Sequence, residues 1–191
     1  RELTRWIRAI FEALQPRDDV DGVDTLARLW LHEGLRLFSD RLVTQAERDA
    51  GWRLLFDGST TAGWRGYQMT TMPTGWQAKD GALTRVGAGA DIVTAEQYAG
   101  FELTLEWRIS PKGNSGIMYR VTEADSNSYE TGPEYQVLDD EGHRDGLSRL
   151  TAAGAVYGLY PAPDSLVRPV GEWNQARIVI TSSITGPVTG F

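Results

Sequence analysis

Polar side chains that can take part in catalysis are concentrated between residues 113 and 145. Two strand patterns lie in this stretch. In 117–121 one face carries Ile117, Tyr119 and Val121 and the other carries Met118 and Arg120, and in 134–138 Tyr135 and Val137 alternate with Glu134 and Gln136. Because successive side chains of a strand point to opposite sides, burying both apolar sets brings the polar sets onto the other surface of one sheet. The polar residues are Arg120, Glu134 and Gln136 on the strands, with His143 and Asp145 in the loop that follows. We expect them to form one polar binding face.

The elements that must position this face are predicted to be mostly β. In the clearest strand, 101–109, one face carries Phe101, Leu103, Leu105, Trp107 and Ile109. One apolar and one polar face are typical of an antiparallel sandwich. A hairpin turn is predicted at Asp80-Gly81, a pair that favours positive φ angles. Many short strands with turns at regular intervals favour a β-sandwich or jelly roll over an α/β fold.

Composition narrows the class of partner. The chain has 191 residues, 41% of them hydrophobic, which is sufficient for a real core. Its net charge of −7 and the lack of a basic cluster argue against a nucleic-acid partner. With no cysteine, the chain can form neither a disulfide nor a thiolate zinc site. No apolar run reaches the length of a membrane span, and the absence of a signal-peptide pattern at Arg1 predicts a processed chain or a fragment.

The first 49 residues differ from the rest and predict two helices. Apolar residues recur at helical spacing from Trp6 to Leu14, before Pro16, and again along about 23–43. Stripes of this width need a partner surface. We therefore expect both helices to pack on the following domain, on another chain or on a further segment.

Four segments carry a resemblance to a known family. They are NSGIMYR, GPEYQVLDDEGHRDG, TAAGAVYGLYP and PVGEWNQARIVI. In this order they resemble the 3-keto-disaccharide hydrolase domain family, and GWRLLFDGSTTAGWRG near Gly51 is similar to the opening of that family. The resemblance implies a concanavalin A-like antiparallel β-sandwich (a jelly roll) and a role in the bacterial breakdown of oxidised glycosides. It ends at about Thr181, where members of the family continue through further strands.

The reaction that this resemblance implies acts on a sugar whose C3 is a ketone. The ketone acidifies the hydrogen on C2, a base removes it, and the enolate then expels the glycosidic oxygen from C1. Such a site needs a base with a pKa near the working pH and a group that stabilises the enolate. By residue type His143 is the best base, and Arg120 is the natural stabiliser. Glu134 can orient the histidine, act as the base itself or hold a sugar hydroxyl.

Further residues are expected to contact the substrate. They are Gln136, Asn114, Asp139, Asp145 and Trp64. Simpler roles remain open for several members of the site. Arg120 can form an ion pair with Glu134, and His143 can be an ordinary loop residue. The acidic run that starts at Asp139 can be a solvated turn, and Asn114 can belong to a tight turn.

No cofactor is required by these residues. A divalent metal held by His143 with Asp145 or Glu134 would polarise the ketone as a Lewis acid, and it stands as an alternative. Direct hydrolysis by two carboxylates is a second alternative, which depends on the distance between them.

The N-terminal segment has a resemblance of its own. RELTRWIRAIFEALQP and LARLWLHEGLRLFSDRLVTQAER resemble a stretch of the dynein heavy chain, from the helical part of its AAA+ motor ring. The segment has no G-x-x-x-x-G-K-[ST] loop to bind phosphate, so it cannot be an ATPase by itself. A chimeric or engineered chain is the simplest explanation for the two resemblances.

The sequence thus predicts a helical segment over 1–49, a sugar-active β-sandwich over 50–181 and a tail over 182–191. The predicted activity is the cleavage of 3-keto-glycosides. The alternatives are a non-catalytic carbohydrate-binding module and a structural dynein fragment fused to an unrelated domain. The family resemblance implies an extracytoplasmic location, whereas a native dynein-like segment implies a cytoplasmic one.

Overall fold

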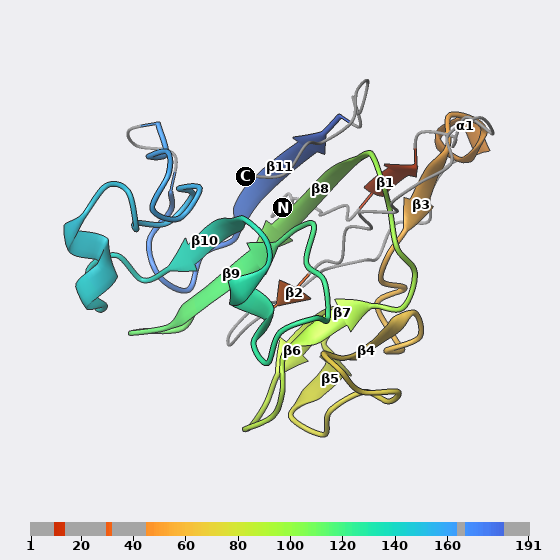
Figure 1. Ribbon diagram of the computed structural model, residues 1–191, viewed down its shortest axis with the longest axis horizontal. Helices are drawn as coiled ribbons and strands as arrows, with labels where there is room; N and C mark the ends of the chain where they lie inside the picture. The colour runs from red at the N-terminus through yellow and green to blue at the C-terminus, as the bar shows by residue number, and fades with distance from the viewer. Residues whose placement is uncertain (1–9, 14–29, 32–44, 164–166, 182–191) are drawn as a thin grey trace, which may run out of the picture.

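The described part of the protein is a two-layer antiparallel β structure with a small hairpin beside it (Figure 1). The computed structural model describes residues 10–13, 30–31, 45–163 and 167–181. One sheet has the strand order β11-β8-β1-β3, and the other has the order β10-β9-β2-β7-β4. Strands β5 and β6 form the separate hairpin. This arrangement confirms the prediction of a mostly β sandwich.

The strands are short, as the turn spacing predicted. The first sheet contains β11 (Asn174–Ile180), β8 (Phe101–Trp107), β1 (Ile10–Ala13) and β3 (Trp52–Leu54). The second contains β10 (Glu134–Leu138), β9 (Asn114–Met118), β2 (Trp30–Leu31), β7 (Ile92–Thr94) and β4 (Trp64–Gly66). The hairpin consists of β5 (Trp76–Lys79) and β6 (Ala82–Arg85), and the helical elements are α1 (Gln45–Asp49), η1 (Ser128–Glu130) and η2 (Arg144–Leu147). No helix in these described ranges has the length and apolar character needed to cross a membrane.

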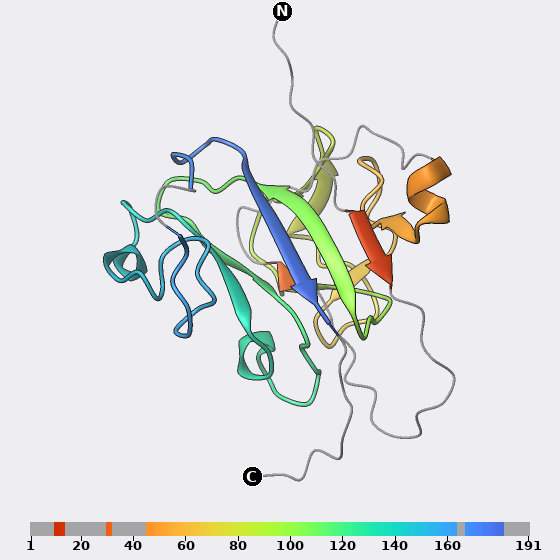
Figure 2. The same ribbon diagram turned by 90° about the horizontal axis from the view of Figure 1, so that it is seen from above.

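The main core lies between the two sheets. Strand β8 supplies Phe101, Leu103, Leu105 and Trp107, each at most 3% exposed, and β9 and β10 supply Ile117 and Val137 from the facing layer. Figure 2 shows β11, β8 and β1 side by side in one layer, with β9 and β10 in the other. The apolar face predicted for residues 101–109 is therefore confirmed, including the core position of Trp107.

The hairpin turn predicted at Asp80-Gly81 is present. Lys79 pairs with Ala82 at the end of the β5–β6 ladder, and the two residues between them have φ angles of 52° and 73°. Two consecutive positive φ angles are what a two-residue hairpin loop needs, and Asp-Gly adopts them at low cost.

The two helices predicted at about 6–14 and 23–43 are not confirmed, and the two short parts of them that the structure describes are strands. Ile10–Ala13 is the strand β1 between β8 and β3, and Trp30–Leu31 is the strand β2 between β9 and β7. An extended segment satisfies the backbone donors and acceptors of two neighbouring strands at once, which a helix cannot do. The remaining parts of both predicted helices, and the tail 182–191, lie outside the described residues.

The strand alternation after β9 also differs from the prediction. Arg120 has a φ of 57°, in the left-handed region. Val121 consequently packs in a second cluster with Met118, Tyr67 and Val93, rather than on the face of Ile117. A residue in the left-handed region breaks the regular alternation of a strand. The side chain that follows it therefore lies on a different side of the sheet.

Leu103→Ala tests the position of the core. Leu103 is 1% exposed and lies opposite Ile178 in the β8–β11 ladder, so the truncation should lower the free energy of unfolding by about 2–5 kcal/mol. Urea denaturation measures this change. The control is Val179→Ala on the neighbouring strand, where the side chain is exposed and the expected change is within about 0.5 kcal/mol. Equal losses in both variants would contradict the assigned core.

Candidate functional site

The site is built around Glu134, the first residue of β10. Glu134 pairs with Met118 of β9, and two residues further on Gln136 pairs with Gly116. Tyr135 and Val137, which alternate with them, pack on the main core. Glu134 and Gln136 therefore lie on the face of the sheet directed away from that core, as the sequence predicted.

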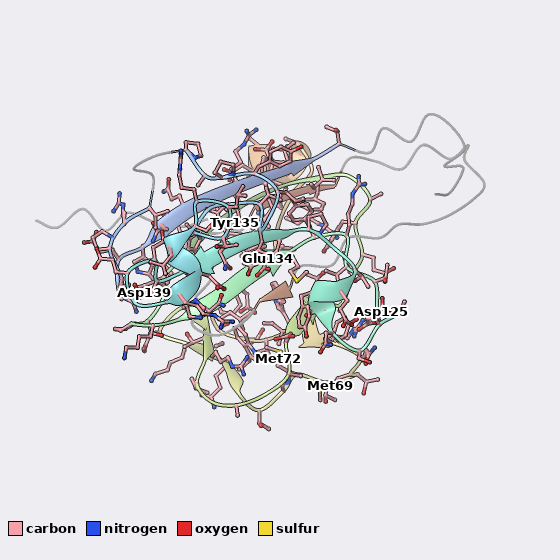
Figure 3. The ribbon with its side chains drawn as sticks, turned by 60° about the vertical axis from the view of Figure 1, so that its left-hand side comes forward. Met69, Met72, Asp125, Glu134, Tyr135 and Asp139 are labelled. Atoms are coloured by element: carbon pink, nitrogen blue, oxygen red, sulfur yellow. The ribbon has the colours of Figure 1, made fainter. Side chains whose placement is uncertain are left out.

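Gly116 makes room for the carboxyl group of Glu134. A Cβ atom on Gly116 would overlap the Oε1 atom of Glu134, so the carboxyl group occupies the space that any other residue at position 116 would fill. In Figure 3 Glu134 lies between Asp139 on one side and Asp125 on the other. The requirement for glycine here comes from a close approach across the strand pair.

The environment of Glu134 favours its neutral form. The pKa of Glu134 is raised from 4.5 to about 7, chiefly by burial and also by the negative charges of Asp145 and Asp91. The carboxyl group has no hydrogen-bond donor among the described residues that would offset these effects. A carboxyl group with a pKa near neutrality can both take up and release a proton at physiological pH.

Asp145 joins His143 and Tyr157 into one cluster beside Glu134. The Nδ1 atom of His143 accepts a hydrogen bond from the Asp145 backbone N–H at 3.3 Å and lies 3.7 Å from its Oδ2 atom. The Tyr157 hydroxyl donates to the same Oδ2 atom at 3.4 Å. Burial raises the pKa of Tyr157, and the charges of Asp145 and Glu134 add to the effect. Because Nδ1 accepts a hydrogen bond, a neutral His143 carries its proton on Nε2.

Backbone hydrogen bonds hold this cluster on β10. The N–H of Tyr157 donates to the Glu134 carbonyl at 2.9 Å, and the N–H of Gln136 donates to the Ala155 carbonyl at 2.9 Å. The Thr151 hydroxyl donates to the Asp145 carbonyl at 2.5 Å. The loop 151–157 thus runs along the outer edge of β10 and fixes the distance between Tyr157 and Glu134.

Asp139 has a structural environment. It is 5% exposed, and its carboxylate accepts hydrogen bonds from the backbone N–H groups of Lys112 at 2.6 Å, Gly142 at 2.9 Å and Glu141 at 3.2 Å. The Lys112 N–H is the main reason that the pKa of Asp139 is lowered, and the charge of His143 also contributes. Asp139 therefore joins two loops, and these contacts occupy the oxygens that were predicted to bind a sugar.

Three other residues that were predicted to contact the substrate differ in the solvent exposure of their side chains. Gln136 is 1% exposed, and its amide donates to the Thr151 carbonyl at 3.3 Å. Trp64 is a core residue whose indole N–H donates to the Leu55 carbonyl at 2.7 Å, so it does not offer a ring for stacking. Asn114 begins β9 opposite Leu138 and is half-buried. Of the three, Asn114 keeps the most accessible side chain.

Arg120 is not paired with Glu134. Both residues lie in the described part of the chain, and no ion pair joins them. Arg120 lies near Tyr119 instead: burial raises the pKa of Tyr119, and the charge of Arg120 opposes this effect. The Nε atom of Arg120 is buried and has no hydrogen-bond partner among the described residues. The structural ion pair that the sequence allowed is absent, and the catalytic role of Arg120 stays a prediction.

The predicted metal ligands do not converge. Within the described ranges, no group of three or more His, Cys, Asp or Glu side chains is arranged to hold a metal ion. His143 and Asp145 are close together, but they form no such group with Glu134. The donor set therefore does not fit the metal alternative.

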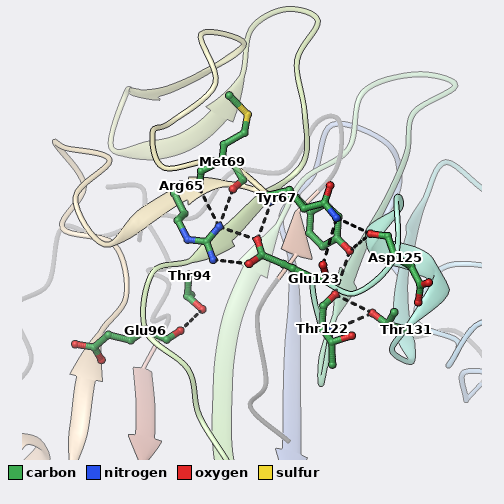
Figure 4. Close-up of polar contacts among 11 residues, drawn as sticks. Arg65, Tyr67, Met69, Thr94, Glu96, Thr122, Glu123, Asp125 and Thr131 are labelled. Carbon is green, nitrogen blue, oxygen red and sulfur yellow. Dashed lines mark hydrogen bonds and ion pairs between the residues drawn. The ribbon is translucent and has the colours of Figure 1, made fainter.

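A network of polar contacts surrounds the ion pair between Arg65 and Glu123 (Figure 4). Arg65 on β4 donates to both carboxylate oxygens of Glu123, at 2.7 and 3.0 Å. Glu123 also accepts the backbone N–H of Gln68 at 2.7 Å, and the Tyr67 hydroxyl donates to the carbonyls of Thr122 and Asp125. A bidentate, half-buried pair of this kind fixes orientation as well as distance. It holds the loop after β4 against the loop after β9.

The sequence missed Tyr157, Asp91 and Gly116. Tyr157 lies in the segment TAAGAVYGLYP that carried the resemblance, but its position beside Glu134 depends on a backbone contact with β10. Asp91 precedes β7, three strands away from β10, and accepts a hydrogen bond from the Ser128 hydroxyl at 3.0 Å. The spacing of residues along one strand cannot reveal either neighbour.

Comparison with known proteins identifies the family. The model of the 3-keto-alpha-glucoside-1,2-lyase-like domain matches residues 51–184, so the chain belongs to this family. A 3-keto-disaccharide hydrolase of Bacteroides thetaiotaomicron is 35% identical over 152 residues, which are 68% of this chain and 52% of that protein. The chain therefore spans about half the length of this curated relative.

A solved structure and a second family match complete the comparison. The crystal structure of a candidate glycosyl hydrolase from Parabacteroides distasonis has a TM-score of 0.68 and 34% identity, with 74% of this chain and 69% of that chain covered. Residues 1–48 match the ATPase lid domain of the dynein heavy chain. Over 48 residues the identity to the cytoplasmic dynein heavy chain of Drosophila melanogaster is 58%, which covers 25% of this chain and 1% of that protein.

Gly116→Ala tests the space around Glu134. The new methyl group should push the carboxyl group out of its half-buried position, and the pKa of Glu134 should therefore fall from about 7 toward 4.5. The pKa is measured by NMR titration of the carboxyl carbon. Gly87→Ala is the control, because a Cβ atom there meets open space. An unchanged Glu134 pKa in Gly116→Ala would contradict the close approach.

Asp145→Asn tests the electrostatic coupling. Removing the charge of Asp145 should lower the pKa of Glu134, although burial, the larger cause, keeps it above 4.5. The same NMR titration measures the shift. The exposed carboxylate Glu141, changed to Gln, serves as the control and should leave the titration unchanged.

Proposed function

We propose that the sandwich cleaves 3-keto-glycosides and that Glu134 is the base. The observation that carries this proposal is the half-buried carboxyl group, which is held over Gly116 on a sheet face away from the core and has a pKa of about 7. The family of the chain supports the substrate class. It also supports the finer assignment of the sandwich to the concanavalin A-like type.

The reaction proceeds in two stages, an elimination and then a hydration. Ionised Glu134 takes the proton from C2, and the electron pair of the C2–H bond is delocalised onto the C3 oxygen as an enolate. The enolate then collapses, so that a C1=C2 double bond forms, the C1–O bond breaks and its electron pair leaves with the glycosidic oxygen. Addition of water across the double bond afterwards completes a net hydrolysis. Each stage needs a base whose pKa is close to the pH of the medium.

The neighbours of Glu134 have supporting roles in this proposal. His143 donates from Nε2 to the departing oxygen, while the backbone N–H of Asp145 holds the imidazole through Nδ1. Tyr157 stays protonated, because its pKa is raised, and donates a hydrogen bond. Arg120 stabilises the enolate oxygen; its support is a buried Nε atom without a partner among the described residues. Asn114 is assigned to a sugar hydroxyl, whereas Gln136, which is buried and donates to the Thr151 carbonyl, supports the loop beside β10.

Glu134→Gln tests the assignment of the base. Turnover of a 3-keto-glucoside should fall at least about 100-fold, because the amide cannot accept the C2 proton. The assay follows release of the leaving group, with Glu141→Gln as a matched control that should retain turnover. If Glu134→Gln binds the sugar with unchanged affinity and the wild-type chain shows no turnover, the carbohydrate-binding alternative is correct.

The raised pKa of Glu134 also predicts how activity and stability change with pH. As a base, Glu134 must be ionised, so kcat/KM should rise with pH to a plateau above about 7.

The free energy of unfolding should change with pH in the opposite direction. The raised pKa favours the folded state at pH values below 4.5, and this contribution is lost as the pH rises through about 7. Wild type should therefore lose stability relative to Glu134→Gln between pH 4.5 and 7 in urea denaturation, and parallel curves would contradict the burial of the carboxyl group.

A further inference from the structure

A single loop next to Glu134 carries most of the exposed apolar side chains of the described residues. Large apolar or aromatic residues that are at least 40% exposed within the loop are Leu147, Leu150, Tyr157, Leu159 and Tyr160. Leu147 is 91% exposed and Tyr160 is 70% exposed. The other exposed residues of this kind are scattered over several elements: Met69, Val86, Tyr129 and Val179. Concentration of apolar area in one place marks a binding surface, whereas scattered residues do not.

The two ends of this loop are tied together. The N–H of Gly158 donates to the Leu150 carbonyl at 2.7 Å, and the N–H groups of Leu159 and Tyr160 both donate to the Val156 carbonyl. Segments 147–150 and 157–160 are therefore joined at Leu150 and Gly158, and we call the five exposed apolar side chains that they carry the apolar shelf. Figures 1 and 2 both show this part of the chain at one end of the molecule, beside β10.

The apolar shelf is continuous with the catalytic cluster. Tyr157 belongs to both: its hydroxyl donates to Asp145, its N–H donates to the Glu134 carbonyl, and its own ring is one of the exposed shelf side chains. A sugar whose C2 faces Glu134 carries its leaving group on the adjacent carbon, C1. The leaving group therefore lies within a bond or two of the reacting atoms, in the region where the shelf begins.

The chemistry of the shelf indicates which leaving group it accepts. Three of its members are leucines, which have no hydrogen-bonding group and cannot satisfy the hydroxyls of a second sugar. Leucine and tyrosine side chains together suit a flat apolar group, which gains from burial and from ring-to-ring contacts. A phenolic oxygen is also a better leaving group than a sugar alkoxide, because phenols ionise near pH 10.

We propose that the apolar shelf binds the leaving group of the substrate and selects 3-keto-glycosides with an aromatic aglycone over 3-keto-disaccharides. This specificity rests on the proposed function of the Glu134 site. It assigns a role to exposed side chains that the cleavage reaction alone does not require.

The first experiment measures binding and does not depend on turnover. The probes are 4-nitrophenyl glucoside and methyl glucoside, neither of which has the C3 ketone needed for elimination. Titration calorimetry should show that wild type binds the aryl glucoside at least about 10-fold more tightly. Leu159→Ser and Tyr160→Ser should each lose most of this preference, whereas Val86→Ser, a matched exposed apolar residue on another loop, should retain it. Equal affinities for the two probes, or a preference that survives both shelf substitutions, would overturn the proposal.

The second experiment separates failure of the shelf from failure of the proposed function. The ratio of kcat/KM for a 4-nitrophenyl 3-keto-glucoside to that for a 3-keto-disaccharide should exceed about 10 in wild type and decrease in Tyr160→Ser, mainly through KM. If Glu134→Gln turns over both substrates normally, the assignment of the base is wrong while the binding result still decides the shelf. If sedimentation shows that wild type dimerises and Leu159→Ser does not, the shelf is a contact between copies of the chain, and the proposal fails.

Discussion

The position of one carboxyl group against the β9–β10 pair is the constraint on which the rest of the site depends. The Glu134 carboxyl group can occupy its place on the sheet only because the diagonally opposite residue on β9 is Gly116, where no side chain competes for the space. The same position removes the carboxyl group from most of the solvent and places it near two other carboxylates, which holds its pKa near 7. This position disfavours the ionised form of Glu134, and for the same reason the carboxyl group can take up and release a proton at neutral pH.

Glu134 and Asp139 lie at the two ends of one strand and show how environment alone separates two acids. Asp139 accepts three backbone N–H groups, which stabilise its charged form and lower its pKa. Glu134 has no donor of this kind among the described residues, so burial raises its pKa instead. One carboxylate thus fastens the loops around the site, and the other is left available for chemistry. The Arg65–Glu123 pair likewise joins the loop after β4 to the loop after β9.

The N-terminal segment joins the sandwich in a way its sequence relationship does not suggest. Residues 1–48 match a dynein lid domain, yet Ile10–Ala13 and Trp30–Leu31 occupy interior positions of the two sheets. Strands β8 and β9 each present a row of backbone N–H and C=O groups that need partners. An extended segment of almost any sequence can pair with them, because the hydrogen bonds join main-chain groups and not side chains. Sheet pairing can therefore recruit a segment whose apolar pattern is helical.

The sequence by itself determined the features that depend on local pattern. The period-two alternation of 101–107 established the strand and its core face, the Asp80-Gly81 pair established a hairpin turn, and the alternation in 134–137 put Glu134 and Gln136 on the same side of the sheet. Tertiary structure alone decided the rest. The left-handed backbone at Arg120 ended the alternation that placed Val121, and contacts between distant segments brought Tyr157 and Asp91 to Glu134. The physical reason is that strand periodicity fixes only which way a side chain points, whereas the charge state of a group depends on everything that the fold packs around it.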